Sequence, residues 1–252
     1  MSSSPTATDS TTHSSISCSS RPDGSSGDGC RSGDDWRSGK ERRSRPDRPP
    51  GSPATLAVIA CGALAGLVRD IVARRGWPVE VYPLPAILHN RPDQIAPAAA
   101  ELARSLQARG LPVALGYADC GSYGALDELC SQLGIARLRG LHCYDVLGGA
   151  DRVRALFERE PGTYLLTDFL VRSFDRTVVA GLGLDRYPQL WADYFGQYRK
   201  LVWLAQDRDT ALDREAAGIA DRFGLPLHIV DVGTSGLEHE LSVLLAAKAS
   251  AG

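Results

Sequence analysis

The sequence predicts an α/β protein with a doubly wound, mostly parallel sheet and helices on both faces of that sheet. From residue 54 onward, apolar runs of strand length alternate with segments whose apolar residues recur at helical spacing. The strand-like runs are continuously apolar, which is typical of strands that are covered on both sides. No repeat or Pro/Ser-rich linker interrupts the alternation, so residues 53–249 are expected to form a single α/β domain, with two lobes that meet near residues 140–180.

Each element is assigned from its own local pattern. "TLAVIAC" (55–61) has the length of a buried strand, and the helical period that follows it stops at Gly76. The helix of 91–110 has Asp93 near its start and Gly110 just past its end, which suit the two helix termini. Further strands are expected at 77–86, 111–118, 200–206 and 225–233, with a short strand inside 136–149 and a strand leading into a helix inside 163–174. Further helices are expected at 62–76, 123–134, 150–162, 188–199, 211–224 and 237–249.

Residues 1–52 have a different composition from the rest of the chain. They are Ser, Asp, Arg, Gly and Pro with almost no aliphatic residues. Such a segment buries too little apolar surface to offset its chain entropy, so a disordered tail is predicted there. Its stretch "KERRSRPDR" is either an interaction arm or part of an extension without function, and its mixed charges favour the second interpretation.

Composition narrows the class of protein. The formal net charge of the 252 residues is −2, so no basic field points to nucleic acid. The longest apolar run (55–68) is shorter than the ~18–20 residues of a membrane helix, and the N-terminal segment lacks the apolar stretch of a secretory signal. We therefore expect a soluble, cytoplasmic protein that binds a small molecule and neither nucleic acid nor a membrane. In a reducing compartment its cysteines are thiols, metal ligands or core residues.

Three cysteines follow predicted strands. Cys61, Cys120 and Cys143 each stand where an apolar run ends, and the carboxyl ends of parallel strands share the edge at which such sheets bind ligands. Three thiols at one edge suit zinc or an iron–sulfur cluster. Alternatively, Cys120 is a nucleophile activated by the helix that follows it, or the three thiols only pack. Cys130 lies inside a helical pattern and is expected to be a structural thiol.

Other residues of the same edge complete the candidate site. His89, in the loop "LPAILHNRP", is the expected fourth metal ligand or a proton carrier, although it could equally be a surface residue. Gly62, Gly121 and Gly124 stand beside the cysteine positions and would let a ligand approach closely.

Two further features are candidate ligand contacts. The turn with Thr234 and Ser235 precedes a helix, and it either binds an anion or simply caps that helix. Asp168, at a predicted strand end, either supports a ligand or caps the next helix.

Five motifs in order resemble one known family. They are "IACGAL", "LPAILHNRPDQI", "GYADCGSYGALDEL", "HCYDVLGG" and "TYLLTDF", and together they resemble the domain-of-unknown-function family 1638 (DUF1638) from about Leu56 to the last helix. The resemblance implies that Cys61, His89, Cys120 and Cys143 match motif positions of the family. Some members look associated with corrinoid-dependent methyl transfer, so a methyltransferase or corrinoid-protein partner is implied, while no reaction is agreed for the family.

The leading hypothesis is therefore a protein that binds zinc or an iron–sulfur cluster through its three strand-end cysteines, with a possible role in methyl transfer or one-carbon metabolism. A non-catalytic module that binds an anion or a corrinoid is the first alternative, and a metal-free thiol enzyme is the second. The sequence leaves open whether the protein is an enzyme at all.

Overall fold

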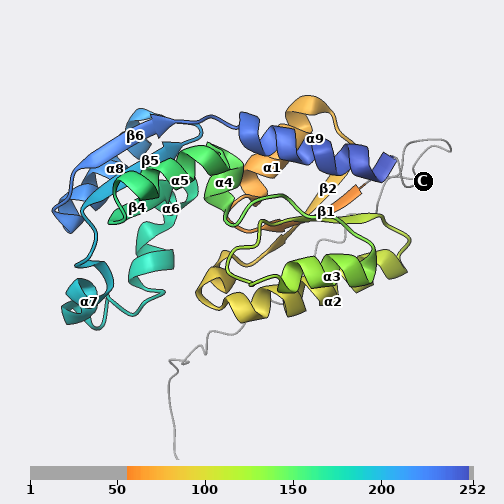
Figure 1. Cartoon of the computed structure of the whole chain (residues 1–252), viewed down its shortest axis with the longest axis horizontal. Helices are drawn as coiled ribbons and strands as arrows, with labels where there is room; N and C mark the ends of the chain where they lie inside the picture. Colours follow the sequence, from red (N-terminus) through yellow and green to blue (C-terminus); the bar gives the residue numbers. More distant parts are fainter. Residues whose placement is uncertain (1–55, 250–252) are drawn as a thin grey trace, which may run out of the picture. The chain divides into compact units, whose positions relative to one another are not determined.

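The strands described in residues 56–249 form two parallel sheets rather than one. The computed structural model describes residues 56–249, so the predicted tail (1–52) lies outside the described residues. One three-stranded sheet has the order β2-β1-β3 and the other has the order β4-β5-β6 (Figure 1). All of their strand pairs are parallel. The predicted α/β class and the parallel strands are confirmed.

The first sheet is built by the N-terminal half of the described chain. Its strands and helices alternate as predicted, and its central strand β1 is buried along its whole length. Helix α1 ends at Gly76, which adopts the left-handed conformation that glycine tolerates best. The elements are β1 (Leu56–Cys61), α1 (Ala65–Arg75), β2 (Val79–Leu84), 3-10 turns at Ala86–Asn90 and Pro92–Gln94, α2 (Ile95–Ala108), β3 (Val113–Gly116) and α3 (Ala125–Leu133).

The second sheet follows two helices. Its central strand β5 is also buried, with Trp203 fully enclosed, whereas β6 at its edge is mostly exposed. The elements are α4 (Cys143–Gly148), α5 (Ala150–Arg159), β4 (Thr163–Thr167), α6 (Asp168–Phe174), a π-helical turn (Asp175–Val179), a 3-10 turn (Pro188–Leu190), α7 (Trp191–Phe195), β5 (Lys200–Ala205), α8 (Thr210–Phe223), β6 (Leu227–Asp231) and α9 (Ser235–Ala249).

The last helix belongs to the core of the first sheet. Leu237, Leu241 and Leu244 of α9 are buried in the same apolar cluster as β1 and α1. Figure 1 shows α9 returning beside α1 after β6, and α9 also contacts α4. The first and last elements described, β1 and α9, thus lie in the same half, and α9 joins the two halves. None of the helices described in residues 56–249 is long and apolar enough to cross a membrane.

The segment between the halves explains why there are two sheets. Arg137 makes only an isolated parallel bridge to Leu115, so the short strand expected inside 136–149 is limited to that bridge. The chain then turns at Gly140, where φ is 110°, and enters α4 and α5 before the next strand begins. Strand β4 therefore pairs with β5 and has no neighbour in the first sheet.

Candidate functional site

The first two strands place Cys61 and His89 at the same edge of the first sheet. Cys61 is the last residue of β1 and pairs in register with Leu84, the last residue of β2. The chain then turns at Pro85 into the 3-10 turn that carries His89. The His89 Nε2 atom lies 3.5 Å from the Cys61 sulfur. The predicted proximity of these two residues is therefore present in the structure.

Gly62 allows this close approach. A Cβ atom at Gly62 would lie 2.5 Å from the Leu84 carbonyl oxygen and 2.7 Å from the Ala86 nitrogen. A side chain at position 62 would therefore push the loop that carries His89 away from Cys61. Gly62 was expected to admit a ligand, but the space beside it is filled by the protein's own backbone.

The hydrogen bond of the other ring nitrogen orients His89. Its Nδ1 atom lies 2.9 Å from the Ala86 carbonyl oxygen, which can only accept a hydrogen bond. Nδ1 therefore carries the proton in the neutral ring, and the Nε2 lone pair faces the Cys61 sulfur. Histidines that bind metals have this arrangement, in which the distal nitrogen is fixed by a backbone carbonyl.

Cys120 lies in a strained loop after β3. Its φ is 51°, a left-handed conformation that costs a non-glycine residue about 1–2 kcal/mol. Its backbone N–H donates to the Leu141 carbonyl at 2.8 Å, and this bond joins the loop to the segment before α4. The following Gly121 and Gly124 also have positive φ, 81° and 88°, so both are needed for the path of the loop.

Cys143 is not at a strand end, contrary to the prediction. It is the first residue of α4, and the preceding His142 is extended and caps that helix. Asp145 Oδ2 accepts from the backbone N–H groups of Leu141 and His142 at 2.8 and 3.1 Å. This reciprocal cap in "HCYD" starts a helix where we had predicted a strand. Cys143 nevertheless lies beside Cys120, because its backbone amide donates to the sulfur of Cys120. We call the edge of the first sheet where Cys61, Cys120 and Cys143 lie the cysteine edge.

The three thiols are electrostatic neighbours. Burial and then the charge of Cys120 raise the pKa of Cys61 to about 12. Hydrogen bonds from the backbone amides of Ala63 and Leu64, just before α1, act in the opposite direction and lower it. Burial raises the pKa of Cys120 to about 11. Burial, and next the charges of Cys120 and Cys61, raise the pKa of Cys143 well above its usual range. All three are therefore protonated thiols at neutral pH in the metal-free protein.

Tyr117 is a site residue that the sequence reasoning missed. Its side chain is fully buried and its ring stacks on His89, with 6.3 Å between centroids and 17° between planes. Its hydroxyl has no hydrogen-bond partner within residues 56–249. Burial, then the nearby Cys61 and Cys120, raise the pKa of the Tyr117 phenol. A buried hydroxyl without a partner is costly, and it points to a group that the described chain does not supply.

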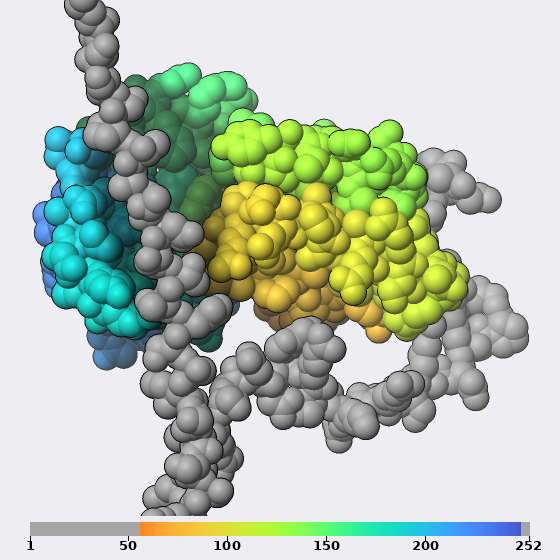
Figure 2. All heavy atoms as spheres, turned by 90° about the horizontal axis from the view of Figure 1, so that it is seen from below, coloured from red at the N-terminus to blue at the C-terminus, as the bar shows by residue number. Residues whose placement is uncertain are grey.

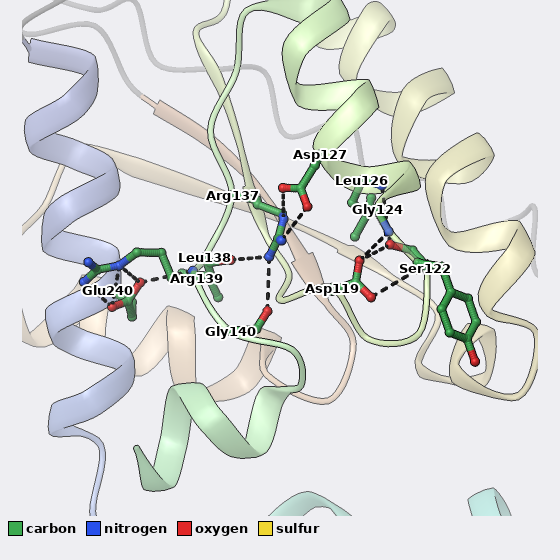
Figure 3. Close-up of polar contacts among 11 residues, drawn as sticks. Asp119, Ser122, Gly124, Leu126, Asp127, Arg137, Leu138, Arg139, Gly140 and Glu240 are labelled. Atoms are coloured by element: carbon green, nitrogen blue, oxygen red, sulfur yellow. Dashed lines mark hydrogen bonds and ion pairs between the residues drawn. The ribbon is translucent and has the colours of Figure 1, made fainter. Parts of the chain in front are cut away.

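The "DCGSYG" loop is supported by a network of polar contacts (Figure 3). Asp119 accepts from the Ser122 hydroxyl at 2.7 Å and from the Gly124 N–H at 3.0 Å. Arg137 pairs with Asp127 through two contacts of 2.7 and 2.8 Å. The same guanidinium donates to the Leu138 and Gly140 carbonyls at 2.9 and 3.3 Å. Because the Gly140 carbonyl also accepts from the Asp119 N–H, Arg137 supports the segment against which Cys120 is held.

A cavity of about 350 Å³ adjoins the cysteine edge. His89 and Cys143 line it from the first sheet and from α4, and Tyr164 and Tyr198 line it from the second sheet and its loops. Figure 2 shows the gold and yellow-green first half on one side and the teal and blue second half on the other. The crevice expected at the carboxyl ends of the strands is thus present.

Thr234 and Ser235 lie elsewhere. The Thr234 hydroxyl accepts from Arg74 at 3.3 Å, and Glu238 pairs with Arg74 and Arg75. These arginines form the last turn of α1, whereas Cys61 stands just before the start of that helix, and neither Thr234 nor Ser235 lines the cavity. The structure does not bring the turn and the cysteines into one site.

Asp168 is held by hydrogen bonds from other parts of the protein. It is buried and accepts hydrogen bonds from Trp203 Nε1 at 2.8 Å and from the backbone amides of Gln206 and Asp207 at 3.1 and 2.7 Å. The helix cap is supplied by Thr167 instead, whose hydroxyl accepts from the Leu170 amide. Asp168 therefore joins β4 to the end of β5, and three donors already occupy its carboxylate.

The comparison with known families agrees with the motifs. The family model described as "Protein of unknown function (DUF1638)" matches residues 83–241. The chain belongs to the DUF1638 family. The matched segment of this DUF1638 protein contains His89, Cys120 and Cys143 and begins after Cys61. No curated protein and no solved structure matches the chain.

The four sequence-predicted ligands lie near one another, but they are not arranged around a common point. Within residues 56–249, no group of three His, Cys, Asp or Glu side chains is positioned to hold a metal ion. Cys130 is buried in α3, as expected for a structural thiol, and belongs to the core of the first sheet.

Proposed function

We propose that this DUF1638 protein binds a thiophilic metal centre, a zinc ion or an iron–sulfur cluster, through Cys61, Cys120 and Cys143, with His89 as the fourth donor. The observation that carries the proposal is the orientation of His89. Its Nδ1–H is fixed by the Ala86 carbonyl, and its Nε2 lone pair faces the Cys61 sulfur.

The donor set supports this assignment. Three sulfurs and one imidazole nitrogen form a Cys₃His set, which suits zinc, and thiolates are also the ligands of iron–sulfur clusters. The sulfur of Cys61 lies near the first amides of α1, and that of Cys143 lies near its own amide and that of Tyr144 at the start of α4. These N–H groups favour the thiolate forms that a metal requires.

Binding would require two changes in the metal-free arrangement. The cysteine side chains would turn toward a common point, and the thiols would lose their protons to solvent. The loop of Cys120 is attached through its backbone to the segment before α4, so side-chain rotation could occur without moving the backbone.

The cavity beside the site suggests a role beyond structural support. A centre in which one donor is exchangeable would face this cavity, where it could activate a thiol or polarise a small substrate. A role in methyl transfer or one-carbon metabolism, with a methyltransferase or corrinoid-protein partner, is a proposal that rests on the family resemblance.

The two alternatives have less support. A metal-free thiol enzyme needs a thiolate near neutral pH, whereas burial raises the pKa of Cys120 to about 11. An anion-binding module centred on Thr234 is disfavoured because its hydroxyl already bonds Arg74, away from the cavity.

The test is metal analysis of the full chain, purified without oxygen. We expect about one zinc per chain, or iron with acid-labile sulfide and visible absorption. Cys120→Ser should lose most of the metal, and His89→Ala should weaken its retention against a chelator. Cys130→Ser is the matched control, because this buried thiol lies in α3 outside the site. Equal metal content in Cys120→Ser and Cys130→Ser, or no metal in the wild-type protein after reconstitution, would contradict the proposal.

A further inference from the structure

No carboxylate, ammonium or guanidinium group of residues 56–249 lines the cavity beside the cysteine edge. The lining is mostly aliphatic and aromatic, and its polar groups belong to four tyrosines and to His89, Asn90, Cys143, Thr167 and Thr177. Within residues 56–249, this lining includes no Asp, Glu, Lys or Arg. An ion that entered the cavity would lose hydration without gaining a counter-ion, which is strongly unfavourable. In the metal-free protein, the lining therefore selects against charged molecules.

Aromatic rings form one wall of the cavity. The ring of Tyr164 meets that of Tyr198 edge to face, with 5.0 Å between centroids and 85° between planes. It meets Phe195 in the same way, at 5.8 Å and 89°. Tyr194 also lines the cavity and is 47% exposed, so it stands where the cavity meets solvent. Rings held in these orientations offer faces and edges to a further ring.

The wall on the side of the first sheet offers a polar contact. Asn90 follows His89, lines the cavity and is exposed, and its side-chain amide has no hydrogen-bond partner within residues 56–249. An amide can both donate and accept, so it suits a neutral polar group on a ligand. Such pockets combine mostly apolar walls with a few polar groups that fix the ligand's orientation.

We propose that the cavity binds an uncharged aromatic molecule of one or two rings, held against Tyr164, Tyr194 and Tyr198 and oriented by the Asn90 amide. The cavity volume of about 350 Å³ lies at the small end of ligand pockets and sets this size. The proposal rests on the proposed function in one respect, because it takes this molecule to be the substrate that meets the metal centre.

The experiment compares three probes that share one ring system and differ in charge. They are 2-naphthol, which is neutral, 2-naphthoate, an anion, and 2-naphthyltrimethylammonium, a cation. Binding to the full chain is measured by calorimetry near neutral pH, with and without bound metal. We expect 2-naphthol to bind at least tenfold more tightly than either ion.

A pair of tyrosine variants locates the binding. Tyr194→Ala removes one ring of the wall and should weaken 2-naphthol binding about two- to tenfold. Tyr187→Ala is the matched control, because Tyr187 is similarly exposed, at 52%, and does not line the cavity. Asn90→Leu should weaken 2-naphthol more than naphthalene, because only the first has a polar group.

Each other outcome overturns the inference. Equal or tighter binding of the cation would mean that the rings select a positive charge, and tighter binding of the anion would mean that a positive group reaches the cavity. Binding of no probe, or an equal effect of the two tyrosine variants, would mean that the cavity is not this site. Metal content is measured separately, so a wild-type protein that holds no metal after reconstitution would refute the metal proposal, whereas the predicted preference for 2-naphthol in that same protein would leave the ligand class standing.

Discussion

The raised thiol pKa values predict that the cysteines of the site react slowly with alkylating reagents. A thiol with the ordinary pKa of 9.0 is about 10% thiolate at pH 8, whereas pKa values of about 11 and 12 leave about 0.1% for Cys120 and about 0.01% for Cys61. The thiolate is the reacting species. In chelator-treated protein, Cys120 should therefore react about 100-fold more slowly, and Cys61 about 1000-fold more slowly, than the same cysteines in unfolded protein.

The assay is a timed pulse of iodoacetamide followed by peptide mass spectrometry. The chain unfolded in urea supplies the reference rate for each cysteine at the same pH. Because both pKa values are raised, the rates in folded protein should keep rising about tenfold per pH unit beyond pH 9, where the reference rates level off. This slope separates the pKa effect from simple inaccessibility, which slows the reaction equally at every pH.

One result would refute the reasoning and favour the metal-free thiol enzyme. If Cys120 or Cys143 reacted at pH 8 within threefold of its rate in urea, the pKa of that thiol would lie near its ordinary value and burial would not have raised it. A rate well above the urea reference would mean a thiolate near neutral pH in the folded protein. The physical argument from burial would then have missed a group that stabilises the charge.

Three further predictions concern stability. The pKa of Cys61 is raised in the folded state, so the contribution of its thiol to the free energy of unfolding is complete below pH 9 and is lost as pH rises through about 12. At pH 10 the loss is about 1.4 kcal/mol. Cys61→Ala should reduce the drop in unfolding free energy between pH 8 and pH 10 by that amount in urea titrations. Arg137→Ala should destabilise the metal-free protein by about 2 kcal/mol in the same assay, because it leaves the Leu138 carbonyl and the Asp127 carboxylate without this donor and removes one of the two donors of the Gly140 carbonyl. Arg139→Ala, which breaks an exposed pair with Glu240, should cost clearly less, and equal losses would refute the supporting role of Arg137. Tyr117→Phe should be neutral or stabilise the metal-free protein by about 1 kcal/mol, since the buried hydroxyl has no partner in residues 56–249, and a clear destabilisation there would show that the hydroxyl is satisfied.

The strands and helices were largely predictable because their signals are local. β1 and β5 read as continuous apolar runs and are buried as central strands, and glycine follows α1 where its period stops. The placement of Cys61 and His89 at one edge followed from the parallel pairing of β1 and β2 alone.

The prediction for Cys143 was wrong in its local structure and right in its location. The apolar residues before it resemble a strand, but the cap formed by His142 and Asp145 begins a helix at Cys143. The usual capping signature begins with Ser, Thr, Asp or Asn, whereas "HCYD" begins with His, so only the carboxylate three positions later hinted at a helix start.

Other features of the site depend on contacts between distant segments. The buried hydroxyl of Tyr117 and the support from Arg137 carry no signal in the sequence, because each depends on which segments pack around it. Likewise, nothing local to "VGTSG" indicates that Arg74 binds Thr234, 160 residues away in the sequence.

The sequence by itself determined the α/β class, the order of the elements and the family, because apolar periodicity, glycine stops and motifs are properties of short segments. Only the tertiary structure decided how the strands divide. A parallel strand has no local signal for its neighbour, and the helices α4 and α5 after Gly140 direct β4 to a second sheet. The same division placed the cavity, because its walls come from both halves and close only when the chain has folded.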